Sequence, residues 1–261
     1  MFMVGAWGED DGKRKGRYEI CSQIEKIIEA MTPQLWFEPV KDRYIASYQQ
    51  LLREAYGATR RRVWNESFVV AFVQRLFSTQ EGGWMARAGG RCVINREAAA
   101  RLADALNTFD RSNEALWNLV TIVSELVNDS MIGGSKFLHF CLPGLYAITD
   151  QYLRLVSATP PRTPRCDAAR REAEYYRTYM AALNMVKREH AKQAMRWAKK
   201  VFGYRVTRTR AIEAFVFYHV REFDNGRLSA LEPIMDRAPR HASKMTRRRF
   251  YSCIKTSPAV S

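Results

Sequence analysis

Cysteine and histidine patterns that hold metals or cross-links are missing from this chain of 261 residues. Its five cysteines are scattered and no two of them form a C-x-x-C pair, so they indicate neither a disulfide framework nor a zinc or iron–sulfur site. The four histidines, at positions 139, 190, 219 and 241, do not fall at metal-ligand spacing either. We therefore expect no metal and no other cofactor.

Long apolar runs are also lacking. No run approaches the roughly 20 apolar residues that a membrane-spanning helix needs. The N-terminal stretch begins with very few apolar residues and then becomes charged, which is the reverse of the order in a secretory signal. The sequence therefore predicts a cytoplasmic protein that does not contact a membrane, and we expect it to be a monomer.

Acidic residues are scarce relative to basic ones. The chain has 27 Asp and Glu residues against 42 Lys and Arg residues, a formal net charge of +15. Such a charge favours a polyanionic partner, most often nucleic acid, although a basic surface can also serve solubility alone. The excess lies mainly in residues 162–210, with 14 basic and four acidic residues, and in residues 237–255, with seven basic residues and no acidic ones. Predicted phosphate contacts in these segments are Arg196, Lys199, Lys200, Arg247, Arg248 and Arg249.

Apolar residues recur at helical spacing along most of the chain. Helices are predicted over residues 17–31, 42–56, 63–77, 96–109, 112–128, 167–201 and 208–223. One stretch, residues 82–95, has the pattern of a β-hairpin that turns at Gly89-Gly90. We therefore predict an all-α fold with at most one small β-hairpin: a flexible tail over residues 1–16, a helical domain over 17–236 and a basic tail over 237–261.

Four aromatic residues lie among the basic residues of the predicted helix over residues 167–201: Tyr175, Tyr176, Tyr179 and Trp197. Exposed aromatic rings beside basic residues could stack on unpaired bases. Aromatic residues at helical spacing are more often part of the core, which is the interpretation that we favour for most of these four.

Residues 131–156 place a lysine and an aspartate at two predicted helix starts. Ser135 has the residue type of an N-cap, which would make Lys136 the first helical residue. There the positive end of the helix dipole, together with burial, would favour the neutral amine that attacks carbon electrophiles. Alternatively, Lys136 extends into solvent or binds a phosphate beside the amides of Gly133-Gly134. Asp150 is a predicted N-cap, or a carboxylate that stabilises a developing sugar cation.

This segment resembles the helix-hairpin-helix superfamily of DNA glycosylases, and also some bacterial glycosylase-like proteins of anti-phage defence. The resemblance is carried by Gly134-Ser135-Lys136 at the end of a hairpin turn and by Asp150 at the start of the next helix. It implies a two-lobed helical bundle that excises a damaged or modified base from duplex DNA, for example a hypermodified cytosine in phage DNA.

The same resemblance implies roles for individual residues. Asp150 would stabilise the oxocarbenium-like transition state, and Lys136 would form a Schiff base with the sugar or bind a phosphate. Further DNA contacts are predicted at Gly133, Gly134, Ser135 and Arg154, and candidates for the base pocket or wedge are Trp84, Phe140, Tyr146 and Tyr152. The alternative is a non-catalytic DNA- or RNA-binding protein on the same helical scaffold. A nuclease is disfavoured because the sequence lacks the usual nuclease motifs.

Overall fold

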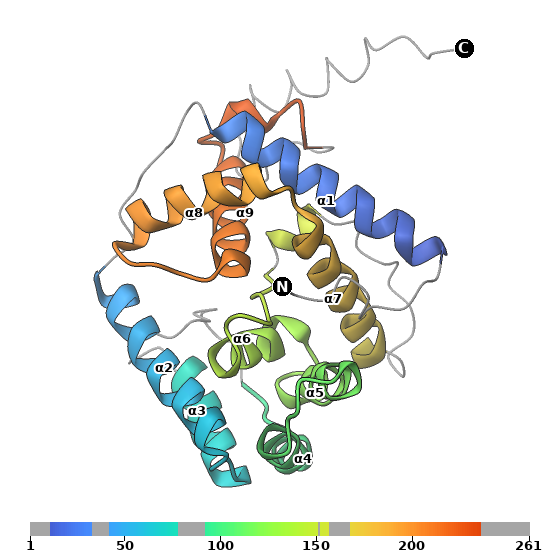
Figure 1. The fold of residues 1–261 in the computed structure, drawn as a ribbon, viewed down its shortest axis with the longest axis vertical. Helices are drawn as coiled ribbons and strands as arrows, with labels where there is room; N and C mark the ends of the chain where they lie inside the picture. Colours follow the sequence, from blue (N-terminus) through green and yellow to red (C-terminus); the bar gives the residue numbers. More distant parts are fainter. Residues whose placement is uncertain (1–10, 33–41, 78–91, 151, 157–167, 236–261) are drawn as a thin grey trace.

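A computed structural model describes residues 11–32, 42–77, 92–150, 152–156 and 168–235. Helices dominate these ranges, which confirms the predicted all-α class (Figure 1). The helices are α1 Asp11–Met31, α2 Asp42–Arg61, α3 Glu66–Phe77, α4 Arg96–Asn107, α5 Asn113–Leu126, α6 Met131–Cys141, α7 Ala168–Met185, α8 Arg188–Phe202 and α9 Arg208–Asp224, with 3-10 helices η1 Leu153–Leu155 and η3 Ser229–Leu231.

The helix starts follow signals that are visible in the sequence. Asn95 accepts a hydrogen bond from the amide of Ala98 at the start of α4, and Ser112 accepts one from the amide of Ala115 at the start of α5. Each cap satisfies an amide that has no partner within its own helix. The predicted N-cap positions of these two helices are therefore confirmed.

One predicted limit is wrong in each of the first two helices. The first helix begins at Asp11 rather than at residue 17, so residues 11–16 of the predicted tail are helical. The second continues past Gly57 to Arg61. Gly57 lacks the left-handed conformation that a glycine at a helix end usually adopts.

The single long helix predicted over residues 167–201 is two helices. The chain leaves helical geometry at Lys187, whose ψ is 151°, between α7 and α8. The amide of Lys187 donates to the Glu25 carboxylate at 2.7 Å, and Arg208 donates to the carbonyls of Leu183 and Val186. These side chains from α1 and α9 replace the helical hydrogen bonds that are missing at the break.

The predicted β-hairpin falls mostly outside the described residues, because residues 78–91 are among those left out. Within the described part, Ile94 forms an isolated antiparallel bridge with Val127. Ile94, in the second strand of the predicted hairpin, therefore pairs with the residue that follows α5. The basic tail over residues 237–261 also lies outside the described ranges.

Two helices run through the centre of the molecule. Nearly every side chain of α6 and α9 is buried. Figure 1 shows α2 to α5 around α6 at one end of the molecule, α8 and α1 near α9 at the other, and α7 along one side. Polar residues of α6 and α9 are consequently enclosed by the rest of the fold.

Candidate buried charge cluster

Helix α6 begins earlier than predicted. Its N-cap is Ser130, whose side chain accepts from the amide of Ile132, so Ser135 lies inside the helix. The Ser135 hydroxyl instead accepts a hydrogen bond at 3.0 Å from the amide of Thr149. Lys136 therefore lies in the second turn, and the prediction that it is the first helical residue is wrong. Its environment is set by burial rather than by the end of the helix.

The two glycines of α6 serve helix packing. A Cβ atom on Gly133 would lie 2.9 Å from the Cβ of Val127, and one on Gly134 would lie 2.9 Å from the carbonyl carbon of Val123. Only glycine therefore lets α6 approach the backbone of α5 this closely. The amides of both glycines also donate to the carbonyl of Ser130 within the helix.

Gly133, Gly134 and Ser135, which are predicted DNA contacts, lie in the interior of the fold. All three residues are buried, and the two glycine amides are occupied by the hydrogen bonds of the first helical turn. A phosphate would need these amides exposed and unpaired. The glycines are explained by the contact between α5 and α6.

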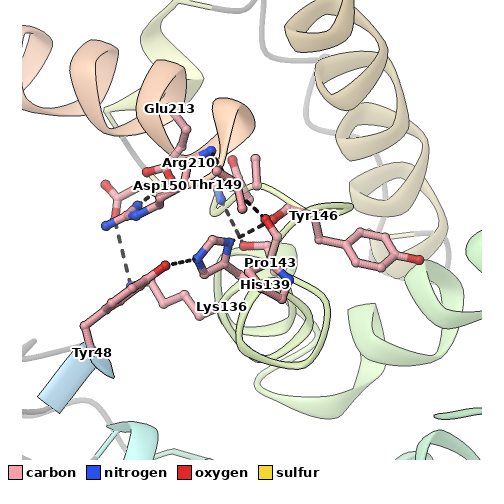
Figure 2. A network of polar contacts seen from close by, with 12 residues as sticks. Tyr48, Lys136, His139, Pro143, Tyr146, Thr149, Asp150, Arg210 and Glu213 are labelled. Atoms are coloured by element: carbon pink, nitrogen blue, oxygen red, sulfur yellow. Dashed lines mark hydrogen bonds and ion pairs between the residues drawn. The ribbon is translucent and has the colours of Figure 1, made fainter. Parts of the chain in front are cut away.

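Lys136 and Asp150 do come together, although 13 residues separate them in the chain. The Lys136 Nζ lies 4.0 Å from the Asp150 Oδ2. The side chain of Lys136 is 7% exposed and that of Asp150 is 20% exposed, so the carboxylate is the part of this pair that solvent reaches more easily. Both side chains are drawn in Figure 2.

Asp150 does not cap an α-helix. Its Oδ1 accepts a hydrogen bond at 3.2 Å from the amide of Tyr152, and the short 3-10 helix η1 follows. This i to i+2 bond is typical of a turn that an aspartate side chain closes. The predicted helix after Asp150 is thus wrong, but one oxygen of the carboxylate is held by the backbone while the other is near the amine.

Burial lowers the pKa of Lys136 from its ordinary value of 10.5 to about 8. The loss of hydration is the largest cause, and the negative charges of Asp150 and Glu213 partly oppose it. A larger fraction of the amine is therefore neutral near pH 7 than for a lysine in water. A neutral amine is the form that can attack a carbon electrophile.

Arg210 and Glu213 complete the group of charges, and sequence analysis did not select them. They lie one turn apart near the start of α9 and form an ion pair in which the side chains are 4% and 2% exposed. Burial raises the pKa of Glu213 to about 7, although the charge of Arg210 opposes that shift. The available signal was an arginine and a glutamate at i, i+3 spacing within an otherwise largely apolar helix.

His139 and Tyr48 form a neutral hydrogen-bonded pair beside these charges (Figure 2). The Tyr48 hydroxyl lies 2.8 Å from the His139 Nε2, and the His139 Nδ1 lies 2.8 Å from the carbonyl oxygen of Tyr146. Since a carbonyl only accepts, Nδ1 carries the proton and Nε2 accepts from Tyr48. Burial and the nearby Arg210 lower the pKa of His139 to about 3, so the ring is neutral at physiological pH.

The predicted base-contacting aromatic residues are mostly enclosed. Phe140 and Tyr146 are fully buried in the core, so neither forms an exposed wedge. Tyr152 is half-buried and packs edge-on against Phe217. Trp84 lies outside the described residues.

The aromatic residues of α7 and α8 belong to the core. Tyr175, Tyr176, Tyr179 and Trp197 are all buried, which confirms the core interpretation and excludes their stacking on bases in this structure. Arg196, Lys199 and Lys200 lie on the opposite, exposed face of α8. Nothing is described for the side chain of Arg154 or for the residues Arg247, Arg248 and Arg249.

The described part of the chain offers no group of three or more His, Cys, Asp or Glu side chains that could hold a metal ion. Among the described helices, none combines the length and apolarity required to cross a membrane. Comparison with known protein families, curated proteins and solved structures finds no match for this chain. The chemistry of the charge cluster is therefore the main basis for a functional assignment.

Proposed function

We propose that this protein is a DNA glycosylase that excises a damaged or modified base from duplex DNA. The proposal depends mainly on one observation: the Lys136 Nζ lies 4.0 Å from the Oδ2 of Asp150, and the Asp150 carboxylate is partly exposed. A fixed carboxylate can stabilise the positive charge that develops on the sugar as the bond to the base breaks. Asp150 is the candidate for this role because one of its oxygens is already held by the Tyr152 amide.

Lys136 is the candidate nucleophile. Its lowered pKa of about 8 makes part of the amine neutral under physiological conditions. The neutral amine would form a bond to the sugar carbon as the bond from that carbon to the base breaks, and the base would leave with a proton. Cleavage of the bond between that carbon and the ring oxygen, which takes up a proton, would then give a Schiff base that reduction can trap. In an enzyme without this step, water would be the nucleophile and Asp150 alone would act on the sugar.

The charge distribution supports a DNA substrate. The exposed face of α8 carries Arg196, Lys199 and Lys200, which can neutralise phosphates in a sequence-independent manner. A base in a duplex must be flipped out before chemistry, and this requires strong contacts to the backbone. Modified bases such as the hypermodified cytosines of phage DNA belong to the proposed substrate class. Their excision would serve defence against phage.

A second candidate function is non-catalytic binding of DNA or RNA on the same helical scaffold. The exposed basic face of α8 favours binding as such, and the enclosure of the Lys136 side chain, which is 7% exposed, favours a structural lysine. In that case the Lys136–Asp150 pair would only join α6 to the segment that follows it.

Incubation of the purified protein with duplexes that carry single damaged or modified bases separates the two functions. A glycosylase releases the base and leaves an abasic site that alkali cleaves, whereas a binding protein only retards the duplex in a gel. Borohydride should trap a covalent adduct in the wild type but not in Lys136→Gln. Lys15→Gln is the matched control, because Lys15 Nζ also lies 4.0 Å from a carboxylate, that of Glu19, but its side chain is 82% exposed. No base release from any duplex would refute the glycosylase.

A further inference from the structure

Arg210 and Glu213 bury two charges at the start of α9, where their side chains are 4% and 2% exposed. Removing such charges from water costs several kcal/mol for each ion, and apolar replacements of a buried pair are often neutral or stabilising. Stability alone therefore explains this pair poorly. Its position beside Lys136 and Asp150 suggests a different explanation (Figure 2).

The charges of both residues act on the Lys136 amine. Glu213 favours the protonated amine, as Asp150 does, and Arg210 opposes it. The protonation of Lys136 is thus influenced by a carboxylate from α9 and by one from the segment after α6. Among Asp150, Glu213 and Arg210, only Asp150 is appreciably exposed. Solvent therefore screens the electrostatic effect of Glu213 and Arg210 on the amine less than it screens that of Asp150.

The remaining titratable groups around the cluster are neutral near pH 7. Burial raises the pKa of Tyr48 on α2 to about 12 and lowers that of His139 on α6 to about 3. Burial also raises the pKa values of Tyr176 and Tyr179 on α7 well above 10. Near neutral pH, the charges that act on the amine are consequently those of Asp150, Glu213 and Arg210.

We propose that the Arg210–Glu213 pair on α9 is a positioning pair that sets the protonation state of Lys136. Glu213 holds the proton on the amine, and Arg210 limits that effect by compensating the glutamate charge. The pair thereby determines how much of Lys136 is present as the nucleophile. The catalytic meaning of this inference rests on the proposed glycosylase function, but the coupling itself is a property of the protein without DNA.

Competitive acetylation over pH 6 to 11 measures this coupling. Trace labelled acetic anhydride reacts with neutral amines, and mass spectrometry of the Lys136 peptide then yields the pH midpoint, with Lys15 as the internal reference. The midpoint of the wild type should lie near pH 8. In Glu213→Gln it should fall by about one pH unit, which means about tenfold more neutral amine at a given pH below the midpoint. In Arg210→Met, loss of the Arg210 charge also favours protonation of Glu213, so the repulsion from Arg210 and the attraction from Glu213 weaken together and the midpoint should move less than in Glu213→Gln. A midpoint in Glu213→Gln that equals or exceeds that of the wild type would overturn the proposal, and so would a larger fall in Arg210→Met than in Glu213→Gln.

A variant that fails to fold is recognised by the loss of its helical circular dichroism signal. The coupling is then measured through the titration of Glu213 in Lys136→Met, a variant that removes the amine and leaves the sequence of α9 unchanged. The Lys136 charge lowers the pKa of Glu213, so in ¹³C-glutamate-labelled protein the carboxyl that titrates near pH 7 should move to higher pH. An unmoved carboxyl resonance would contradict the proposal. Because DNA is absent from both measurements, their outcome is independent of whether the protein excises a base.

Discussion

Gly134 lies where α6 packs directly against the backbone of α5, and Gly134→Ala tests this contact. The added Cβ would lie 2.9 Å from the carbonyl carbon of Val123 and closer still to its oxygen, so the two helices would have to separate. Overpacking of this kind costs about 1–3 kcal/mol, and a clash with backbone belongs at the upper end of that range. Alanine recovers about 1 kcal/mol because it favours the helix more than glycine does. We expect a net loss of about 2 kcal/mol in the free energy of unfolding.

Thermal and urea unfolding followed by circular dichroism measure this loss, which should lower Tm by about 4–8 °C in a protein of this size. Gly57→Ala is the matched control, because it is the same substitution within α2 and its Cβ would meet only the flexible side chain of Arg61, at 3.4 Å. That variant should be more stable than the wild type by up to about 1 kcal/mol. If Gly134→Ala were as stable as Gly57→Ala, the packing explanation of the α6 glycines would be refuted.

Three further predictions concern the charges and the buried polar groups. Lys136→Met should be more stable than the wild type by about 3 kcal/mol below pH 8, and this difference should vanish towards pH 10.5. The reason is that, between these pH values, the Lys136 amine binds fewer protons in the folded protein than in the unfolded one. Urea unfolding at several pH values tests this prediction. Tyr48→Phe should lose about 1–3 kcal/mol in the same assay, since the buried His139 Nε2 loses its donor, and an unchanged stability would contradict the assigned tautomer. Reversal of the α8 charges should weaken binding to all DNA sequences alike and reduce the log–log salt slope by up to about 0.9 for each phosphate that the variant no longer neutralises. The variant is Arg196→Glu/Lys199→Glu/Lys200→Glu. Its control of equal charge change is the exposed α2 set Arg53→Glu/Arg60→Glu/Arg61→Glu. Equal binding by both triple variants would reject α8 as the DNA-binding surface.

The helices and much of the core could be predicted because their signals are local. The caps at Asn95 and Ser112 and the helical spacing of apolar residues each depend on a few neighbouring residues. The break between α7 and α8 could not be predicted in this way. It is stabilised by Glu25 and Arg208, which are distant from Lys187 in sequence.

The start of α6 shows the same limit within the site. Ser130 and Ser135 are both suitable caps, and local pattern does not distinguish them. The choice depends on Gly133 and Gly134, which must face α5 for the two helices to pack. The approach of Lys136 to Asp150 was implied by the resemblance to the glycosylases. The placement of Arg210 and Glu213 beside this pair depends on the path of α9, which no local signal contains.

The most direct test of the proposed function is the rate of base excision by Asp150→Asn under single-turnover conditions. Asparagine keeps the oxygen that accepts from the Tyr152 amide and removes the negative charge. Asp110→Asn is the matched control, because the Asp110 Oδ1 accepts in the same way from the amide of Ser112, at 2.8 Å, on the exposed surface. We predict that Asp150→Asn loses on the order of a hundred- to a thousandfold in rate. It should bind DNA nearly as well as the wild type, and Asp110→Asn should retain full activity. A wild-type rate of excision in Asp150→Asn would contradict the glycosylase mechanism proposed for this site.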